Sequence, residues 1–243
     1  MKLLFKKLLF PLLRFTYNFY SSKERSYSYK GINVRVMPGV FHPGLFFSTK
    51  LLLEYISKKD LNNKTVLELG AGSGLISIYC ATQNAKVTAS DINPTAIKNI
   101  IKNSELNNVQ LEVIESDLFD NIVMRKFDYI IVNPPYFPKD PKNEKELAWF
   151  CGNDFQYFKK LFAQLNNYKT QETVVLMILS EDCDLQRIAS IANDNHFSMS
   201  MVFQKKVFGE ANYIFRINCH AELVSASNFE FIRFRNRFGM TVV

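Results

Sequence analysis

The sequence predicts an α/β fold, a mostly parallel β-sheet that has helices on both faces and ends in an antiparallel hairpin. Two observations predict it. From residue 64 onward, short and almost continuously apolar segments alternate with helical segments, which is typical of parallel strands buried on both faces. Further on, two strand-like segments, 198–207 and 211–218, are joined near Gly209 and Glu210 with no helix between them, so we expect them to form the hairpin.

Local signals place each element in order. Residues 31–40 alternate apolar and polar side chains and stop at Pro38-Gly39, which indicates a strand and a turn, and residues 44–57 have helical spacing. Asn93 and Pro94 are a typical N-cap and first residue of a helix. In the alternating part we expect strands at 65–69, 86–92, 109–114, 127–132 and 173–179, and helices at 75–82, 94–107, 154–165 and 184–195.

The composition is that of a globular protein. Of the 243 residues, 47% are hydrophobic and 22% are charged, and there are only 9 glycines and 8 prolines. These values exclude wholesale disorder, a collagen-like chain and low-complexity sequence. No apolar run approaches the ~20 residues that a membrane-spanning helix needs.

The cysteines and histidines indicate neither disulfides nor metal. The four cysteines form no CxxC pair, and the three histidines are far apart without the spacing of a zinc site. We therefore expect reduced thiols, a cytoplasmic location and no metal. The residues are Cys80, Cys151, Cys183 and Cys219, and His42, His196 and His220.

The formal net charge of +7 is concentrated at the N-terminal end. Residues 1–30 contain seven Lys or Arg and one Glu, whereas residues 31–218 contain 20 basic and 20 acidic residues. The strong positive field expected of a nonspecific nucleic-acid binder is therefore not evident over the main part. We predict an N-terminal extension over 1–30, a main domain over 31–218 and a C-terminal tail over 219–243.

The two ends of the chain have their own patterns. The extension favours a basic amphipathic helix that docks on the domain itself or contacts a membrane surface or the ribosome. Pro11 and Arg14 interrupt its apolar run, which argues against a secretory signal. The tail resembles translated repeat sequence at the ends of some bacterial open reading frames, or it forms one more amphipathic edge element.

A glycine loop follows the first strand of the alternation. Residues 68–74 read ELGAGSG, and such glycines let the backbone turn sharply and let a ligand approach closely. A dinucleotide fingerprint would be G-x-G-x-x-G, but Leu75 stands where its third glycine would be. The loop therefore favours a ligand without phosphates.

Two carboxylates follow the next strands. Asp91 lies 21 residues after Gly70, where a carboxylate can accept both ribose hydroxyls, and Asp117 can meet an adenine amine. Singly, Asp91 can cap the next helix and Asp117 can begin a turn. Together with the glycine loop they favour S-adenosylmethionine, whose cationic sulfonium Glu68 can offset, unless Glu68 orients the loop instead.

The sequence Asn133-Pro134-Pro135-Tyr136 ends the fourth strand and fits methyl transfer to a planar NH2 group. The nitrogen of such a group is weakly nucleophilic, so positioning supplies much of the rate. The Asn133 side-chain oxygen and the Pro134 carbonyl can accept its two N–H donors, and Tyr136 offers a flat face. The prolines add no competing N–H donor. The alternative is a strand stopped by two prolines.

The segments ELGAGSG, SDIN, ESD and NPPY, in this order, resemble class I S-adenosylmethionine-dependent methyltransferases of the small methyltransferase group, and are similar to release-factor glutamine methyltransferases. The resemblance spans residues 31–218 and implies a Rossmann-like, seven-stranded sheet and N-methylation. It implies substrate contacts at Asn133, Pro134, Pro135 and Tyr136. It implies cofactor contacts at Glu68, Gly70, Ala71, Gly72, Gly74, Asp91, Ile92, Asp117, Leu118 and Asn133.

The chain departs from that family in two places. The segment from Phe41 to Thr49, which in such enzymes lies over the cofactor, has Gly44-Leu45-Phe46-Phe47 instead of acidic residues. The large N-terminal helical domain that binds the release factor is missing. Both departures concern the acceptor.

Four functions remain open. The leading hypothesis is methylation of a protein glutamine side chain, and the alternative is methylation of an exocyclic amine of adenine or guanine in RNA or DNA, with the flipped base on Tyr136. A cofactor-binding module without catalysis and a NAD-dependent oxidoreductase are weaker, because the motifs are intact and the loop spacing is wrong for a dinucleotide.

Overall fold

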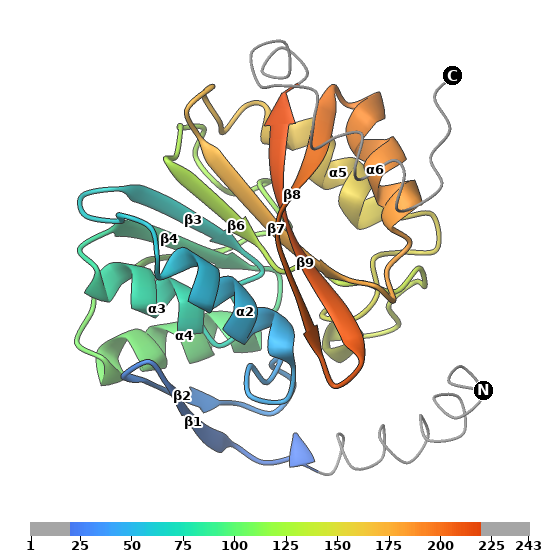
Figure 1. Ribbon diagram of the computed structural model, residues 1–243. Helices are drawn as coiled ribbons and strands as arrows, with labels where there is room; N and C mark the ends of the chain where they lie inside the picture. Colours follow the sequence, from blue (N-terminus) through green and yellow to red (C-terminus); the bar gives the residue numbers. More distant parts are fainter. Residues whose placement is uncertain (1–19, 220–243) are drawn as a thin grey trace.

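The computed structural model describes residues 20–219, which form one seven-stranded sheet flanked by helices and a separate two-stranded sheet (Figure 1). The strands are β1 (Arg25–Tyr29), β2 (Ile32–Val36), β3 (Thr65–Leu69), β4 (Lys86–Asp91), β5 (Glu112–Glu115), β6 (Tyr129–Val132), β7 (Val174–Ser180), β8 (Phe197–Val207) and β9 (Glu210–Cys219). The helices are α2 (Phe47–Ile56), α3 (Leu75–Thr82), α4 (Pro94–Leu106), α5 (Gln156–Leu165) and α6 (Leu185–Asp194), with a 3-10 turn η1 (Glu144–Glu146).

The strand order in the large sheet is β5-β4-β3-β6-β7-β9-β8. The first five strands are parallel, and β9 runs antiparallel to both β7 and β8. This confirms the predicted mostly parallel sheet with a terminal antiparallel hairpin. The strand order reverses between β3 and β6, and in open α/β sheets ligands bind in the crevice outside the carboxyl ends of the strands at such a point.

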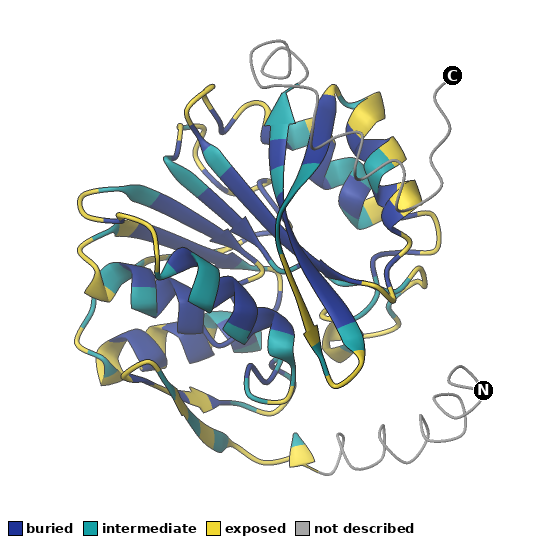
Figure 2. Ribbon diagram, viewed as in Figure 1, coloured by how far each residue is buried: buried dark blue, intermediate teal, exposed yellow. Residues whose placement is uncertain are grey.

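Alternate side chains of the central strands face two hydrophobic clusters. Val66 of β3 packs with α2 and α3, whereas Leu67 and Leu69 of the same strand pack with α5 and α6. Both sets are almost completely buried, as the dark central strands of Figure 2 show. Burial on both faces is the reason that these strands are almost continuously apolar in sequence.

The elements agree with the sequence-based boundaries to within a few residues. The side chain of Asn93 accepts a hydrogen bond from the Thr95 N–H, which confirms it as the N-cap of α4. Strand β5 begins three residues later than expected. Asn108 has a φ of 52°, and the Val109 N–H donates to the Ser104 carbonyl at 3.1 Å, so the turn that ends α4 extends into the predicted strand.

Strand β1 was not expected. Residues 25–29, which the sequence analysis placed in the N-terminal extension, pair antiparallel with β2. The other edge of β2 is covered by two asparagines of α4 and the asparagine that caps its C-terminal end, spaced four residues apart. Asn99, Asn103 and Asn107 bond the backbone of residues 33–37, where a further strand would otherwise lie.

The predicted amphipathic helix of the first residues and the tail after Cys219 lie outside the described residues. Among the helices of residues 20–219, none is long and apolar enough to cross a membrane.

Candidate active site

A cavity of about 550 Å³ lies at the carboxyl edge of the parallel strands, where the order of β3 and β6 reverses. It brings together most of the residues that the sequence analysis selected. The predicted residues that line it are Glu68, Gly70, Ala71, Gly72, Asp91, Ile92, Asp117, Leu118, Asn133, Pro134, Pro135 and Tyr136.

The glycine loop forms one wall of the cavity. Gly70 and Gly72 have φ values of +70° and +56°, which residues other than glycine rarely adopt. A Cβ placed on Gly70 would meet no atom within 4 Å, and one on Gly72 would meet only Phe41 and Val40 at 4.0 Å. The loop therefore leaves open space beside its backbone, which a ligand can fill.

Gly74 is the one predicted residue that does not line the cavity. It is the N-cap of α3, with a φ of +77°, and a Cβ there would meet Ile100 at 3.3 Å. The positive φ and the close approach of Ile100 of α4 both favour glycine at this position.

Asp91 holds the glycine loop in place. One of its carboxylate oxygens accepts from the Gly72 N–H at 2.8 Å and the other from the Asn93 N–H at 2.9 Å. Burial raises the pKa of Asp91 above its usual range, and these backbone donors oppose the rise. The carboxylate still has lone pairs for a hydroxyl at the cavity wall.

Glu68 is buried, with 5% of its surface exposed, and binds α3 rather than standing free. Its Oε2 accepts from the Ser77 N–H at 2.8 Å and also from the Ser77 hydroxyl. Burial raises the pKa of Glu68 to about 8, and the negative charge of Asp91 adds to the rise. The side chain therefore orients the start of α3 behind the loop.

Asp117 lies at the cavity wall and is paired with Lys160 of α5, which also binds Asp120 at 2.6 Å. Tyr157, one helical turn from Lys160, lines the same wall. Burial, together with the charges of Asp91 and Asp117, raises the pKa of Tyr157 well above its usual range. Sequence reasoning missed both α5 residues, because their spacing is that of any amphipathic helix.

The turn at residues 133–136 has a fixed side-chain network. The Asn133 Nδ2 donates to the Ser48 Oγ and the Thr49 Oγ1, both at 3.3 Å, and its Oδ1 accepts from the Tyr136 hydroxyl at 2.9 Å. Burial raises the pKa of Tyr136, which keeps this hydroxyl protonated. The amide of Asn133 is thus oriented with one lone pair of Oδ1 still available.

The bond from the Tyr136 hydroxyl to Asn133 adds to the predicted role of the Tyr136 ring as a flat face. Its partner Asn133 also binds Ser48 and Thr49 of α2, a segment about 85 residues earlier in the chain. No sequence signal could have shown this contact, because it depends on how α2 packs against the end of β6.

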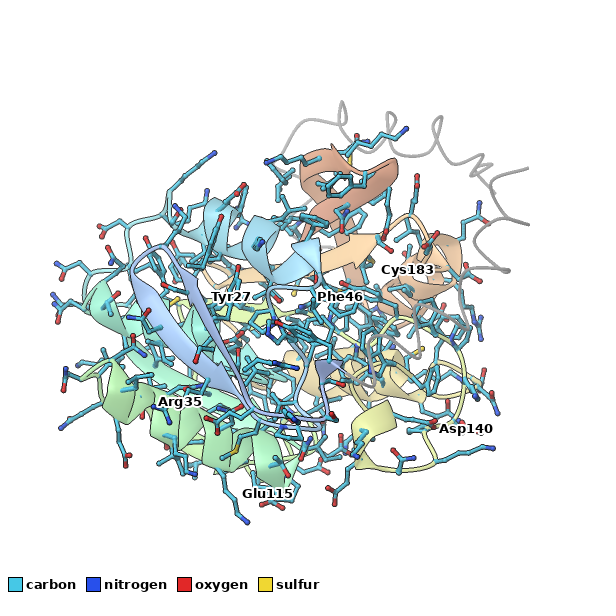
Figure 3. All side chains as sticks on the ribbon, turned by 90° about the horizontal axis from the view of Figure 1, so that it is seen from below. Tyr27, Arg35, Phe46, Glu115, Asp140 and Cys183 are labelled. Carbon is cyan, nitrogen blue, oxygen red and sulfur yellow. The ribbon has the colours of Figure 1, made fainter. Side chains whose placement is uncertain are left out.

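Three aromatic rings form a wall between the glycine loop and the turn. Phe41 packs against Phe46 with ring centroids 4.8 Å apart, and Trp149 lies 5.4 Å from Phe41 and 4.9 Å from Phe46. All three line the cavity. Figure 3 shows Phe46 at the start of α2 and Asp140 on the segment that follows the turn. The expected position of residues 41–49 beside the site thus agrees with the structure.

The segment after Tyr136 returns to the cavity. The N–H groups of Tyr136 and Phe137 donate to the Trp149 carbonyl at 3.1 and 2.9 Å, and the Cys151 N–H donates to the Phe137 carbonyl at 2.9 Å. These bonds hold Trp149 next to the turn. Within residues 20–219, no group of His, Cys, Asp and Glu side chains is arranged to hold a metal ion.

The comparisons with known proteins agree with this architecture. A family model described as "Methyltransferase small domain" matches residues 31–150. The chain is 40% identical over 157 residues to a putative protein N5-glutamine methyltransferase of Methanocaldococcus jannaschii, covering 62% of this chain and 77% of the relative.

Two further relatives are matched over a smaller share of their own length. A release factor glutamine methyltransferase of Fusobacterium nucleatum is 29% identical over 219 residues, or 84% of this chain and 60% of the relative. A ribosomal RNA small subunit methyltransferase C of Buchnera aphidicola is 36% identical over 132 residues, or 53% of this chain and 40% of the relative.

A solved structure has the same fold. The 16S rRNA N2 G1207 methyltransferase of T. thermophilus, in complex with AdoMet and guanosine, superposes with a TM-score of 0.58 at 18% identity, covering 80% of this chain and 50% of that chain. The protein described here belongs to the small-domain family of class I methyltransferases, which confirms the resemblance seen in the sequence. Its cofactor is S-adenosylmethionine, as predicted.

The residues present fit this cofactor. The loop leaves open space at Gly70, and acidic side chains surround a cavity that suits a cationic ligand. When bound, S-adenosylmethionine supplies an electrophilic methyl group.

Proposed function

We propose that this protein methylates the side-chain amide nitrogen of a glutamine in a protein acceptor. The observation that carries the proposal is the oriented amide of Asn133, held by Ser48, Thr49 and Tyr136 at the wall of the cavity. The NH2 group of the substrate has two N–H groups to donate, and two fixed hydrogen-bond acceptors can hold it facing the methyl group of the cofactor.

The roles of the turn residues follow from this arrangement. Asn133 Oδ1 and the Pro134 carbonyl accept the two N–H bonds of the acceptor nitrogen, which stabilises the positive charge that develops on it during transfer. Nδ2 of Asn133 is engaged by Ser48 and Thr49, so Oδ1 is the atom that can accept from the acceptor nitrogen. Pro135 and Tyr136 complete the turn, and the Tyr136 ring provides a flat surface for the amide.

The remaining residues hold the cofactor. We assign the ribose hydroxyls to Asp91 and the adenine amine to Asp117, while Gly70, Ala71 and Gly72 form the cradle beside the methionine portion. Ile92 and Leu118, which follow the two aspartates, line the cavity as apolar neighbours of the adenine. Glu68 and Gly74 act through the loop and α3, since the first bonds Ser77 and the second packs on Ile100.

The charge of the cavity lining supports a protein rather than a nucleic-acid acceptor. Among the described residues that line it, Lys160 is the only basic one, and it is paired with Asp117. Nucleic-acid binding depends on Lys and Arg contacts to phosphate, which an acidic lining opposes. Besides Glu68, which burial keeps protonated, the acidic lining residues are Asp91, Asp117, Asp140, Glu144, Asp182 and Glu210.

The proposal is tested by incubating the purified protein and labelled S-adenosylmethionine with a peptide release factor, with the same factor carrying Asn in place of its acceptor glutamine, and with ribosomal RNA. We expect label only in the first factor, at the glutamine, as found by mass spectrometry. Label in the ribosomal RNA and none in the factor would reject glutamine as the acceptor and favour the exocyclic amine of a base.

We also propose that the protein acts in the cytoplasm. Cys80, Cys151 and Cys183 are buried free thiols, which suit a reducing compartment, and peptide release takes place there. Contact of residues 1–20 with the ribosome or a membrane surface remains part of this proposal.

A further inference from the structure

The turn of the β8–β9 hairpin has an unusual residue. Val207 pairs with Glu210, so the turn consists of only two residues, Phe208 and Gly209. Both have positive φ values, +48° and +87°. Two-residue hairpin turns of this conformation favour Asn-Gly or Asp-Gly, because a bulky side chain at the first position is strained.

Burial does not compensate this strain. The Phe208 side chain is 94% exposed, more than any other large apolar residue of the described chain. Its ring has one aromatic neighbour, Phe47 at the start of α2, with centroids 5.4 Å apart. A polar residue would therefore suit the described fold better at this position, because contacts within residues 20–219 do not account for the phenyl group.

The turn lies at the edge of the sheet that carries the active site. Glu210, two residues after Phe208, lines the cavity, and so does Phe46, which precedes Phe47. The Glu181 N–H donates to the Ala211 carbonyl at 2.8 Å, which joins the base of the turn to the carboxyl end of β7. The turn between β8 and β9 therefore lies near the part of the cavity that Glu210 lines (Figure 1).

We infer that Phe208 is a docking anchor for a folded protein acceptor, and that its ring enters an apolar depression on the acceptor beside the segment that carries the glutamine. The inference rests on the proposed function. Exposed aromatic side chains that become buried in a complex commonly supply a large share of the binding free energy. A short peptide that fills only the cavity does not reach the turn.

The test compares two acceptors and two matched variants. Phe208→Asn removes the ring and gives the turn its preferred residue, whereas Val123→Asn removes an apolar side chain that is 73% exposed and does not line the cavity. Each variant is assayed with an intact peptide release factor and with a synthetic peptide of about ten residues, short enough to fill only the cavity, centred on its acceptor glutamine.

We expect Phe208→Asn to lower kcat/KM for the intact factor by about tenfold, through KM, and to leave the peptide reaction unchanged. Its Tm should stay the same or rise, Phe208→Tyr should retain activity, and Val123→Asn should change neither reaction. Equal losses with both acceptors, or no loss with the intact factor, would overturn the docking role. If the unaltered protein methylates neither acceptor, the proposed function fails, and this inference fails with it.

Discussion

At the scale of single residues, the site depends on how Asn133 is oriented. An asparagine amide has a donor end and an acceptor end, and only the acceptor end can receive an N–H group. Two hydroxyls on α2 accept from Nδ2, and the Tyr136 hydroxyl donates to Oδ1. These contacts with α2 and Tyr136 hold the amide of Asn133 at the end of β6.

Replacing Asn133 with alanine should separate catalysis from cofactor binding. We expect kcat to fall by about 10²-fold or more, since an acceptor for the transition state is lost. Affinity for S-adenosylhomocysteine, measured by calorimetry, should stay nearly constant. Tyr136→Phe keeps the ring and the Asn133 Oδ1 and removes only the bond from the hydroxyl, so kcat should fall less. Full turnover in Asn133→Ala would contradict the positioning role.

Glu68 should make the stability of the cofactor-free protein depend on pH. Burial raises its pKa to about 8, against an ordinary value of 4.5, so the folded state holds a proton that the unfolded state releases. Stability contributed by this proton is present below the unfolded pKa and is lost as the pH rises toward 8. Glu68→Gln keeps the acceptor for Ser77 without a charge and should remove the loss.

The measurement is the Tm from pH 5 to pH 9 for both proteins. The difference in Tm between Glu68→Gln and the unaltered protein should grow with pH and level off above about 8. A difference that does not depend on pH would show that Glu68 is not protonated in the folded state.

At the scale of elements, side chains of helix α4 bond the free edge of β2, as the backbone of a neighbouring strand would. Asn99, Asn103 and Asn107 accept from and donate to the backbone of β2, so the edge of the small sheet is satisfied by a helix face. Asn103 also donates to the Ser73 carbonyl at 2.9 Å, which ties β2 to the glycine loop. Packing of this small sheet therefore supports the cofactor wall.

Asn103→Ala should lower both stability and cofactor affinity. The change removes the acceptor of the half-buried Arg35 N–H and the donor to the buried Ser73 carbonyl, at a cost of about 1–3 kcal/mol. The Arg35 carbonyl keeps its bond from Asn99. Urea denaturation measures the stability and calorimetry the affinity. Asn107→Ala, at the more exposed end of the row, is the matched control and should cost less than about 1 kcal/mol. Equal effects of the two variants would argue against a special role of Asn103.

At the scale of the whole molecule, the sheet places the residues proposed for cofactor binding beside those proposed for acceptor binding. Asp91 ends β4 and Asn133 follows β6, on either side of β3 and its glycine loop. The reversal of strand order opens a crevice at that point, and we propose that cofactor and acceptor meet there. Mutation of Asp91 should therefore affect cofactor binding, and mutation of Asn133 should affect methyl transfer.

Asp91→Ala should weaken binding of S-adenosylhomocysteine at least about tenfold. The Gly72 and Asn93 N–H groups lose the carboxylate that accepts from them, and the ribose hydroxyls lose their proposed acceptor. At saturating cofactor, the KM for the protein acceptor should remain unchanged. Unchanged cofactor affinity would show that Asp91 serves only as a turn residue.

The sequence alone determined much of the architecture. Apolar runs, the Asn93 cap and the glycine loop are local signals. They located nearly every strand and helix, and all but one of the predicted site residues line the cavity. They missed β1, because its alternation is short and polar and depends on pairing with β2. They also placed Gly74 at the ligand, although it packs on Ile100.

Only the tertiary structure decided how the site is supported. The bonds from Asn133 to Ser48 and Thr49, the contact of Trp149 with Phe41 and Phe46, and the approach of Tyr157 and Lys160 all join segments far apart in the chain. Periodicity and turn propensity report on neighbours in sequence, whereas these contacts arise when helices pack on the two faces of a sheet. The local pattern therefore defines the strand ends, and packing decides which side chains meet there.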